Sequence, residues 1–228
     1  NKNDASIFIR YWGLGLINLE TVSVAQMTFV ILLLAIVTFD GFMGTMLWSE
    51  IQITAFEYIS SVMLIGTAGL LLTVVVFVVL YLGFSKLMKI VSRVELSTID
   101  LARLFVHSLI PIALAYHVAH FLLFLLIQGQ LIIPLLSDPF GLGWNLLGSA
   151  DYRVNFKIVG PNFYWSMSVV SIVIGHIIAV FVAHTIALKL LKDKTIALRT
   201  QYPMLVLMVI YTVASLWIIT QPMYMSSM

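Results

Sequence analysis

Five long apolar segments dominate this sequence, at about residues 24–47, 59–84, 97–127, 161–189 and 203–221. A helix rises about 1.5 Å per residue, so about 20 apolar residues cross the roughly 30 Å of bilayer hydrocarbon. Lipid offers no partner to a backbone N–H or C=O, and a helix satisfies both internally. The sequence therefore predicts an all-α fold, a polytopic membrane helix bundle with about five transmembrane helices.

The composition agrees with a membrane protein and excludes several other classes. Hydrophobic residues make up 61% of the chain and charged residues 10%, with a mean hydropathy of +1.08. Soluble domains are roughly 45–50% apolar and 25% charged. A net charge of +2 without a basic run gives no reason to expect nucleic-acid binding. The absence of cysteine excludes disulfides, iron–sulfur clusters and thiolate-bound metals.

Polar and turn-forming residues divide the chain around these spans. Residues 1–22 have the aromatic and charged character of an interfacial N-terminal segment, residues 23–222 form one transmembrane domain, and residues 223–228 are a tail. Within the domain, Glu50 and Glu57 predict a polar loop, and Ser97 predicts the N-cap of the third span. The turn-rich stretch 128–160 predicts a loop that folds back onto the membrane surface.

Basic residues indicate how the chain is oriented. Eight of the twelve Lys and Arg residues lie at the junctions of spans two and three and of spans four and five: Lys86, Lys89, Arg93, Arg103, Lys189, Lys192, Lys194 and Arg199. Loops rich in Lys and Arg stay in the cytoplasm. We therefore expect a multi-pass protein of the prokaryotic plasma membrane, with its N-terminus inside and its C-terminus and residues 128–160 outside.

All five histidines and one carboxylate, Asp40, lie within the apolar spans, where an ionisable group is costly and indicates function. The helical rise predicts two levels. The outer-to-middle level holds Asp40, His117, His120 and His176, and the inner level holds His107 and His184. On their helices, His117 and His120 are about 60° apart and His176 and His184 about 80° apart, so four imidazoles are able to face one seam.

The outer level predicts a transition-metal site with Asp40, His120 and His176 as ligands and His117 as a further candidate. Imidazole and carboxylate suit Zn, Cu or Fe, and a bound metal would support hydrolytic or redox chemistry by activating water. At the inner level, Pro111 cannot bond the carbonyl of His107, and a kink there would open a pocket beside it. His107 and His184 are therefore candidate cofactor-binding residues.

Two other functions remain open from the residues. Haem is less favoured, because His107 and His120 are about 20 Å apart along the helix and His176 and His184 about 12 Å, which does not suit two stacked haems. Histidines and Asp40 at two depths also suit a proton path, or a non-catalytic subunit of a membrane complex. Expected partners are membrane lipid and other integral membrane subunits. Catalytic residues are not assigned.

A combination of short motifs resembles the second half of the prokaryotic multi-span membrane family named fenitrothion hydrolase-like. The motifs are Thr38-Phe-Asp-Gly41, His107 to Tyr116, Ala119-His120, Gln128-Gly-Gln130, Ser137-Asp-Pro-Phe-Gly141, Gly175-His176 and Ala183-His184. The resemblance implies hydrolysis of an organophosphate ester. It also implies motif roles for Asp40, His107, His120, Gln130, Asp138, His176 and His184, but not for His117. Because it covers only half of typical members, it further implies a companion membrane subunit.

Overall fold

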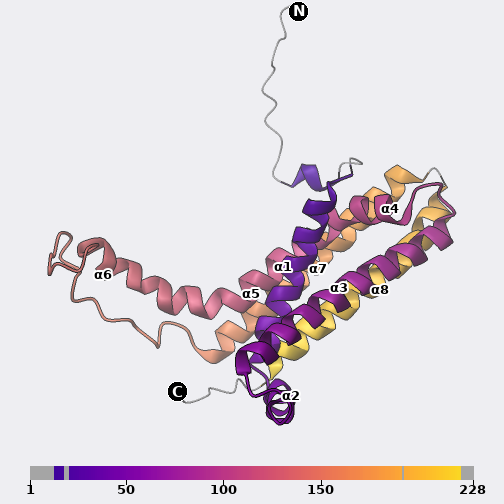
Figure 1. The fold of residues 1–228 in the computed structure, drawn as a ribbon. Coiled ribbons are helices and arrows are strands. Elements are labelled where there is room, and N and C mark those ends of the chain that lie inside the picture. The colour runs from indigo at the N-terminus through magenta and orange to yellow at the C-terminus, as the bar shows by residue number, and fades with distance from the viewer. Residues whose placement is uncertain (1–12, 18–20, 192, 222–228) are drawn as a thin grey trace, which may run out of the picture.

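The computed structural model describes residues 13–17, 21–191 and 193–221, which form helices and loops without a strand (Figure 1). The predicted N-terminal segment 1–22 lies only partly within these residues, with the short 3₁₀ helix η1 (Leu14–Ile17), and the tail 223–228 lies outside them. Five helical stretches are long and apolar enough to cross a membrane: Val24–Met43, Val62–Ser92, Thr98–Ser137, Pro161–Leu190 and Lys194–Thr220. The prediction of an integral membrane protein with five apolar helices is confirmed.

The first span ends earlier than predicted. Helix α1 (Val24–Met43) stops at Gly44, and helix α2 (Met46–Phe56) begins after Thr45, whose hydroxyl caps the N–H of Trp48. The expected polar loop around Glu50 is therefore wrong, since Glu50 lies inside α2. An apolar contact holds α2 against α1: Trp48 packs edge-on against Phe39 at a centroid distance of 5.1 Å. Helix α3 (Val62–Ser92) follows and extends through the basic end predicted as a junction.

The third span consists of five consecutive helical pieces, of which the last two extend it beyond the predicted end. Ser97 caps α4 (Thr98–Phe105), as predicted, and a 3₁₀ turn η2 (Val106–Leu109) joins it to α5 (Ile110–Gln128). In this turn the Ile110 N–H donates to the His107 carbonyl, the group that Pro111 cannot bond. Helical structure then continues through η3 (Gly129–Leu131) and α6 (Ile132–Ser137). The loop predicted to start at residue 128 starts only after Ser137.

The last two spans form a helical hairpin. Helix α7 (Pro161–Leu190) opens at the predicted proline, and α8 (Lys194–Thr220) begins well before the predicted Pro203. The earlier start follows from Asp193, whose carboxylate accepts from the N–H groups of Thr195 and Ile196 and caps the helix. Pro203 therefore lies inside α8.

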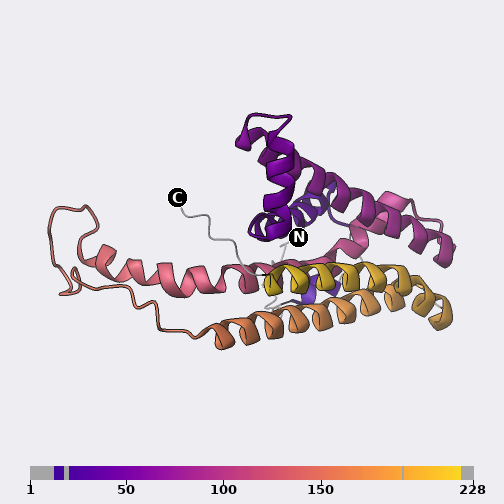
Figure 2. The same cartoon turned by 90° about the horizontal axis from the view of Figure 1, so that it is seen from below.

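Three helix pairs build the bundle, α5 with α7, α3 with α8, and α7 with α8, while α1 crosses between α3 and α5 (Figures 1 and 2). Helices α5 and α7 approach closely at Gly175 of α7, where a Cβ would overlap that of Ala115 and lie 2.8 Å from the carbonyl oxygen of Pro111. Small residues at such a crossing let membrane helices pack by dispersion. Helices α5 and α6 continue beyond the ends of α1, α7 and α8, so the hairpin that they form with the loop leading back to α7 projects from the bundle (Figures 1 and 2).

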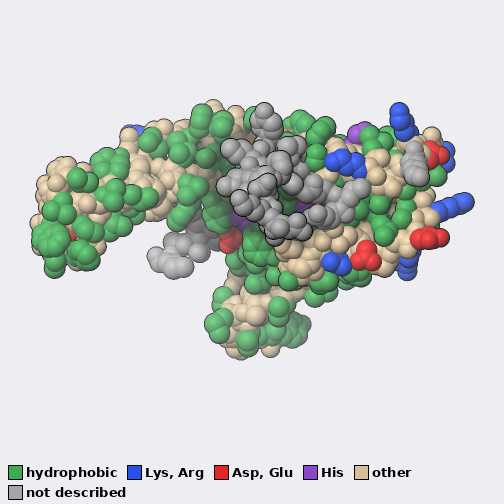
Figure 3. All heavy atoms as spheres, turned by 90° about the horizontal axis from the view of Figure 1, so that it is seen from above, with side chains coloured by type: hydrophobic (Ala, Val, Ile, Leu, Met, Phe, Trp, Pro, Cys, Tyr) green, Lys and Arg blue, Asp and Glu red, His purple; other side chains and the backbone are tan. Residues whose placement is uncertain are grey.

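Charged side chains gather at the opposite end of the molecule from this projection (Figure 3). The α3–α4 and α7–α8 connections meet at that charged end (Figure 1). Between the two ends, the core is mostly apolar. The fully buried Tyr81 makes one of its polar contacts, because its hydroxyl donates to the Ala102 carbonyl at 2.6 Å. The bundle thus has one basic end and one apolar end, with the polar residues of the spans between them.

Candidate functional site

Asp40 of α1 and His120 of α5 form the clearest polar contact between membrane helices. The Nε2–H of His120 donates to Oδ2 of Asp40 at 2.8 Å, and the two side chains are 13% and 47% exposed, respectively. Burying a carboxylate without a partner costs several kcal/mol in a membrane interior, so this hydrogen bond compensates the most costly group of α1. The sequence prediction that these two residues belong together is consistent with this geometry.

The pair lies where three helices approach because residue 41 has no side chain. A Cβ on Gly41 would lie 2.8 Å from Cγ2 of Ile218 in α8, 3.3 Å from the Tyr116 hydroxyl and 3.6 Å from Cε1 of His120. Tyr116 is one helical turn before His120, and their rings are edge-on at 6.3 Å. Gly41 therefore allows α5 and α8 to close around the Asp40–His120 pair.

The Tyr116 hydroxyl is buried without a hydrogen-bond partner among the described residues. Thr38 and Ser215 lie beside it, but their own hydroxyls donate to the carbonyls of Leu34 and Tyr211 one turn back along each helix. An unpaired buried hydroxyl costs about 1–3 kcal/mol, and native proteins keep few of them. The Tyr116 hydroxyl is thus a third polar group next to the Asp40–His120 pair.

Asp40 also lines a pocket of about 510 Å³ between α1, α3 and α5. His117 lines the same pocket, and its Nδ1–H donates to the Ala113 carbonyl at 2.8 Å within its own helix. The ring's Nε2 then carries the lone pair. The carboxylate is thus reached from the side of the bundle, and a second imidazole lies on the wall of that opening.

The two histidines of α7 face α8 and not the α1–α5 seam. Nδ1 of His176 is 2.9 Å from the Thr212 hydroxyl, and Nδ1 of His184 is 2.8 Å from the Gln201 side-chain oxygen. His107, in η2, donates Nδ1–H to the Leu104 carbonyl at 3.0 Å and borders α1 instead. The structure therefore divides the histidines between two seams, where the sequence had suggested one.

The fit of these side chains to a metal depends on distances between donor atoms. Among residues 13–17, 21–191 and 193–221, no three His, Asp or Glu side chains are grouped to hold an ion. Two ligands of a tetrahedral zinc, each about 2.0–2.1 Å from the ion, lie about 3.4 Å apart. The 2.8 Å between Asp40 and His120 is shorter and matches a hydrogen bond. The pair as it stands is an acid–base pair.

Two residues from the family-like motifs have structural roles in the projecting hairpin. The Gln130 side chain is buried, accepts from the Tyr152 hydroxyl at 2.8 Å and the Asn155 N–H at 2.9 Å, and donates to two carbonyls. Asp138 accepts from the N–H groups of Leu142 and Gly143 and so closes a turn. These hydrogen bonds give Gln130 and Asp138 structural roles that require no bound ligand.

Four residues of this region were not singled out from the sequence as site residues: Gly41, Tyr116, Gln201 and Thr212. Tyr116 had a usable signal, because it precedes His120 by four residues and must share its face. Gln201 and Thr212 are polar positions in an apolar helix, but nothing in the sequence says which histidine each would meet. No family model, curated protein or solved structure matches the chain, so the site rests on its own geometry.

Tyr81 and Tyr116, the two tyrosines that are less than 2% exposed among the described residues, give a matched test of the unpaired hydroxyl. Tyr81→Phe removes a hydroxyl that is hydrogen-bonded to Ala102, and we expect it to lower the free energy of unfolding by about 1 kcal/mol. Tyr116→Phe removes an unpaired hydroxyl and should leave stability unchanged or raise it. Thermal unfolding of the detergent-solubilised variants measures both. Equal losses in the two variants would contradict the unpaired state of Tyr116.

Proposed function

We propose that this integral membrane protein conducts protons, and that the Asp40–His120 pair is the group that takes up and passes on the proton. The observation that carries the proposal is the direct 2.8 Å hydrogen bond between a carboxylate and an imidazole of two apolar membrane helices, α1 and α5. Intramembrane Asp and His residues that are paired with one another are typical of proton relays.

The surroundings of the pair support a direction for the proton. Asp40 borders the side pocket and is half exposed, whereas His120 is mostly buried beside Tyr116. Because Nε2 already carries a proton, the step that the existing hydrogen bond supports runs from the imidazole to the carboxylate: Nδ1 of His120 accepts a proton from the inner side, Nε2 gives its own proton to Asp40, and Asp40 releases that proton into the pocket. The next polar groups inward are the hydroxyls of Tyr116 and Ser215.

From Ser215 the polar groups continue along one face of α8. Thr212 lies three residues before Ser215, so the two side chains are neighbours on that helix, and Thr212 contacts His176. Gln201 and its partner His184 lie nearer the basic end. Thr212 and Gln201 are separated by about 16 Å along the helix, so the route needs water molecules in this part.

The orientation and the assembly are part of the same proposal. The positive-inside rule assigns the charged end to the cytoplasm and the projecting hairpin of α5 and α6 to the outside of the prokaryotic cell membrane. Large apolar side chains on this hairpin are exposed, including Leu136, Phe140 and Leu147. Lipid or a neighbouring membrane helix would cover these side chains, and we propose that a companion membrane subunit packs here.

Proton flux into proteoliposomes tests the proposal. With a potassium gradient and valinomycin as driving force and a pH-sensitive dye inside, the wild-type chain should acidify the vesicles. Asp40→Asn and His120→Gln should each slow acidification at least about tenfold, since a positioned acid–base group typically contributes a hundredfold or more to proton transfer. Glu50→Gln is the matched control, because Glu50 is an exposed carboxylate on α2.

The control should acidify at the wild-type rate. Wild-type flux in Asp40→Asn, or no flux above that of empty vesicles in the unmodified chain, would overturn the proposal.

A second candidate function is metal-dependent hydrolytic or redox chemistry at the same place. The observation in its favour is that Asp40 and His117 line one pocket while the free Nε2 of His117 is available as a ligand. A metal held by Asp40, His117 and His120 would require the Asp40–His120 hydrogen bond to open. Of the predicted ligands, His176 would have to leave Thr212 to take part.

Elemental analysis of the purified chain separates the two functions. The proton proposal predicts less than about a tenth of an equivalent of Zn, Cu or Fe after washing with chelator. About one equivalent in the wild type, lost in both Asp40→Asn and His120→Gln, would favour the metal site instead.

A further inference from the structure

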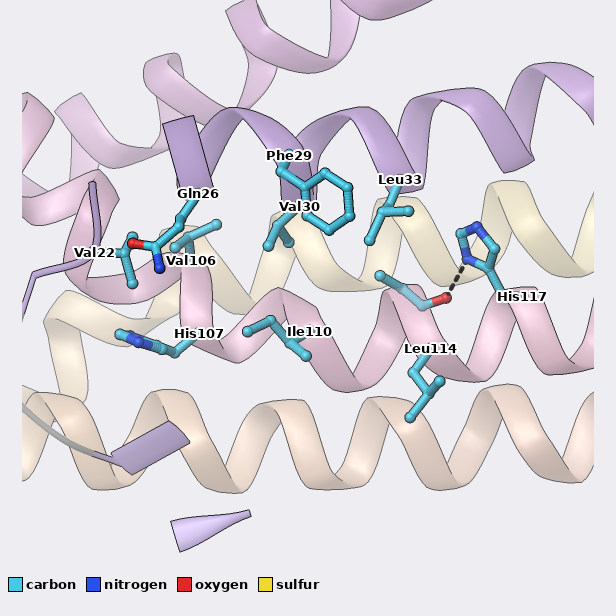
Figure 4. Close-up of a pocket in the computed structure, with 11 residues that line it drawn as sticks. Val22, Gln26, Phe29, Val30, Leu33, Val106, His107, Ile110, Leu114 and His117 are labelled. Atoms are coloured by element: carbon cyan, nitrogen blue, oxygen red, sulfur yellow. Dashed lines mark hydrogen bonds between the residues drawn. The ribbon is translucent and has the colours of Figure 1, made fainter. Parts of the chain in front are cut away.

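A second opening lies along the seam between α1 and α5, on the other side of His117 from the Asp40 pocket. This α1/α5 groove has a volume of about 630 Å³ and is lined almost entirely by apolar side chains such as Phe29, Val30 and Ile110 (Figure 4). Phe29 is 61% and Leu114 52% exposed, so the groove opens sideways from the bundle. In a membrane-spanning chain that side faces lipid.

Polar atoms are concentrated at one end of the groove. Figure 4 shows Gln26 and His107 together at that end and His117 at the other. His107 is 91% buried, and because its Nδ1–H is donated to Leu104, its Nε2 is left for a ligand. The Gln26 side-chain oxygen accepts from Ser23, which leaves its NH₂ group as a donor. The end of the groove thus offers one donor and one nitrogen that accepts or donates.

The length of the groove matches one leaflet of a bilayer. His107 and His117 are ten residues apart, which is about 15 Å along the helix. This equals half of the roughly 30 Å hydrocarbon thickness. The polar end also lies toward the basic end of the bundle, because Arg103 donates to the carbonyl of Val22, a residue of the groove wall.

The lining of the groove indicates which occupant it suits. Its wall is apolar between the polar residues at its ends, which suits a hydrocarbon chain that carries one polar head group. A two-chain phospholipid would leave one chain outside. A single acyl chain is therefore the occupant that the lining and the length of the groove favour.

We propose that the α1/α5 groove binds a long-chain fatty acid, with its carboxyl group on Gln26 and His107 and its chain directed toward His117. A carboxyl group complements this end in both protonation states. As an acid, its O–H donates to Nε2 of His107, and as a carboxylate it accepts from the protonated imidazole. In each state an oxygen accepts from the Gln26 amide.

Photocrosslinking of the full chain in nanodiscs tests this site. The probe is a sixteen-carbon fatty acid that carries a diazirine near its methyl end, compared with the matching fatty alcohol and with a diazirine phosphatidylcholine. Because the diazirine is near the methyl end, we expect the fatty acid to label the His117 end of the groove, around Leu33, Leu114 and His117, in preference to both other probes. His107→Phe should reduce this labelling about tenfold at subsaturating probe, because it removes a hydrogen bond to a charged group.

Two tryptophan variants keep the test independent of how well His107→Phe folds. Leu114→Trp fills the groove and should abolish the labelling, whereas Leu72→Trp, on the lipid-exposed face of α3, should leave it at the wild-type level. Equal labelling by phosphatidylcholine, equal labelling along α3, or unchanged labelling in Leu114→Trp would each overturn the proposal. The outcome does not depend on proton conduction, since neither tryptophan replaces a member of the Asp40–His120 pair.

Discussion

Asp40 is the one carboxylate inside a helix that is otherwise suited to hydrocarbon, and the arrangement of α1 depends on how it is compensated. Its partner is His120, 80 residues away in the sequence and one hydrogen bond away in space. Reaching that partner requires α1 to lie close to α5, and Gly41 permits the approach. The same contact that stabilises the first helix in the membrane therefore creates the acid–base pair to which we assign the function.

The same constraint shapes the second seam. Because lipid satisfies no polar group, each histidine of α7 takes a partner from α8, Thr212 for His176 and Gln201 for His184. Where no neighbouring helix offers a partner, as for His107 and His117, the ring bonds a carbonyl of its own turn. His107 lines the α1/α5 groove, and His117 lines both this groove and the Asp40 pocket. Each opening on the α1–α5 side therefore has an imidazole in its wall.

Hydropathy alone predicts the five spans, because their length is set by bilayer thickness, and local residues predict the helix starts at the Ser97 cap and at Pro161. The polar residues near Glu50 and Lys194 predict loops, but both stretches are helical. Helix α2 begins at the Thr45 cap and α8 at the Asp193 cap. Which helices become neighbours is a long-range property. The sequence therefore identifies Asp40 and His120 as candidates, but it does not show that His176 faces a different seam or that Tyr116 is left unpaired.

A double-mutant cycle on Asp40 and His120 tests the central claim, that these two side chains act as one unit. The unfolding midpoint of the detergent-solubilised chain is compared for Asp40→Asn, His120→Gln and the double variant. Residues that share a hydrogen bond show coupling of at least about 0.5 kcal/mol, so the loss in the double variant should be smaller than the sum of the two single losses by at least that amount. Strictly additive losses would show that the pair does not hold α1 against α5 and would contradict the account.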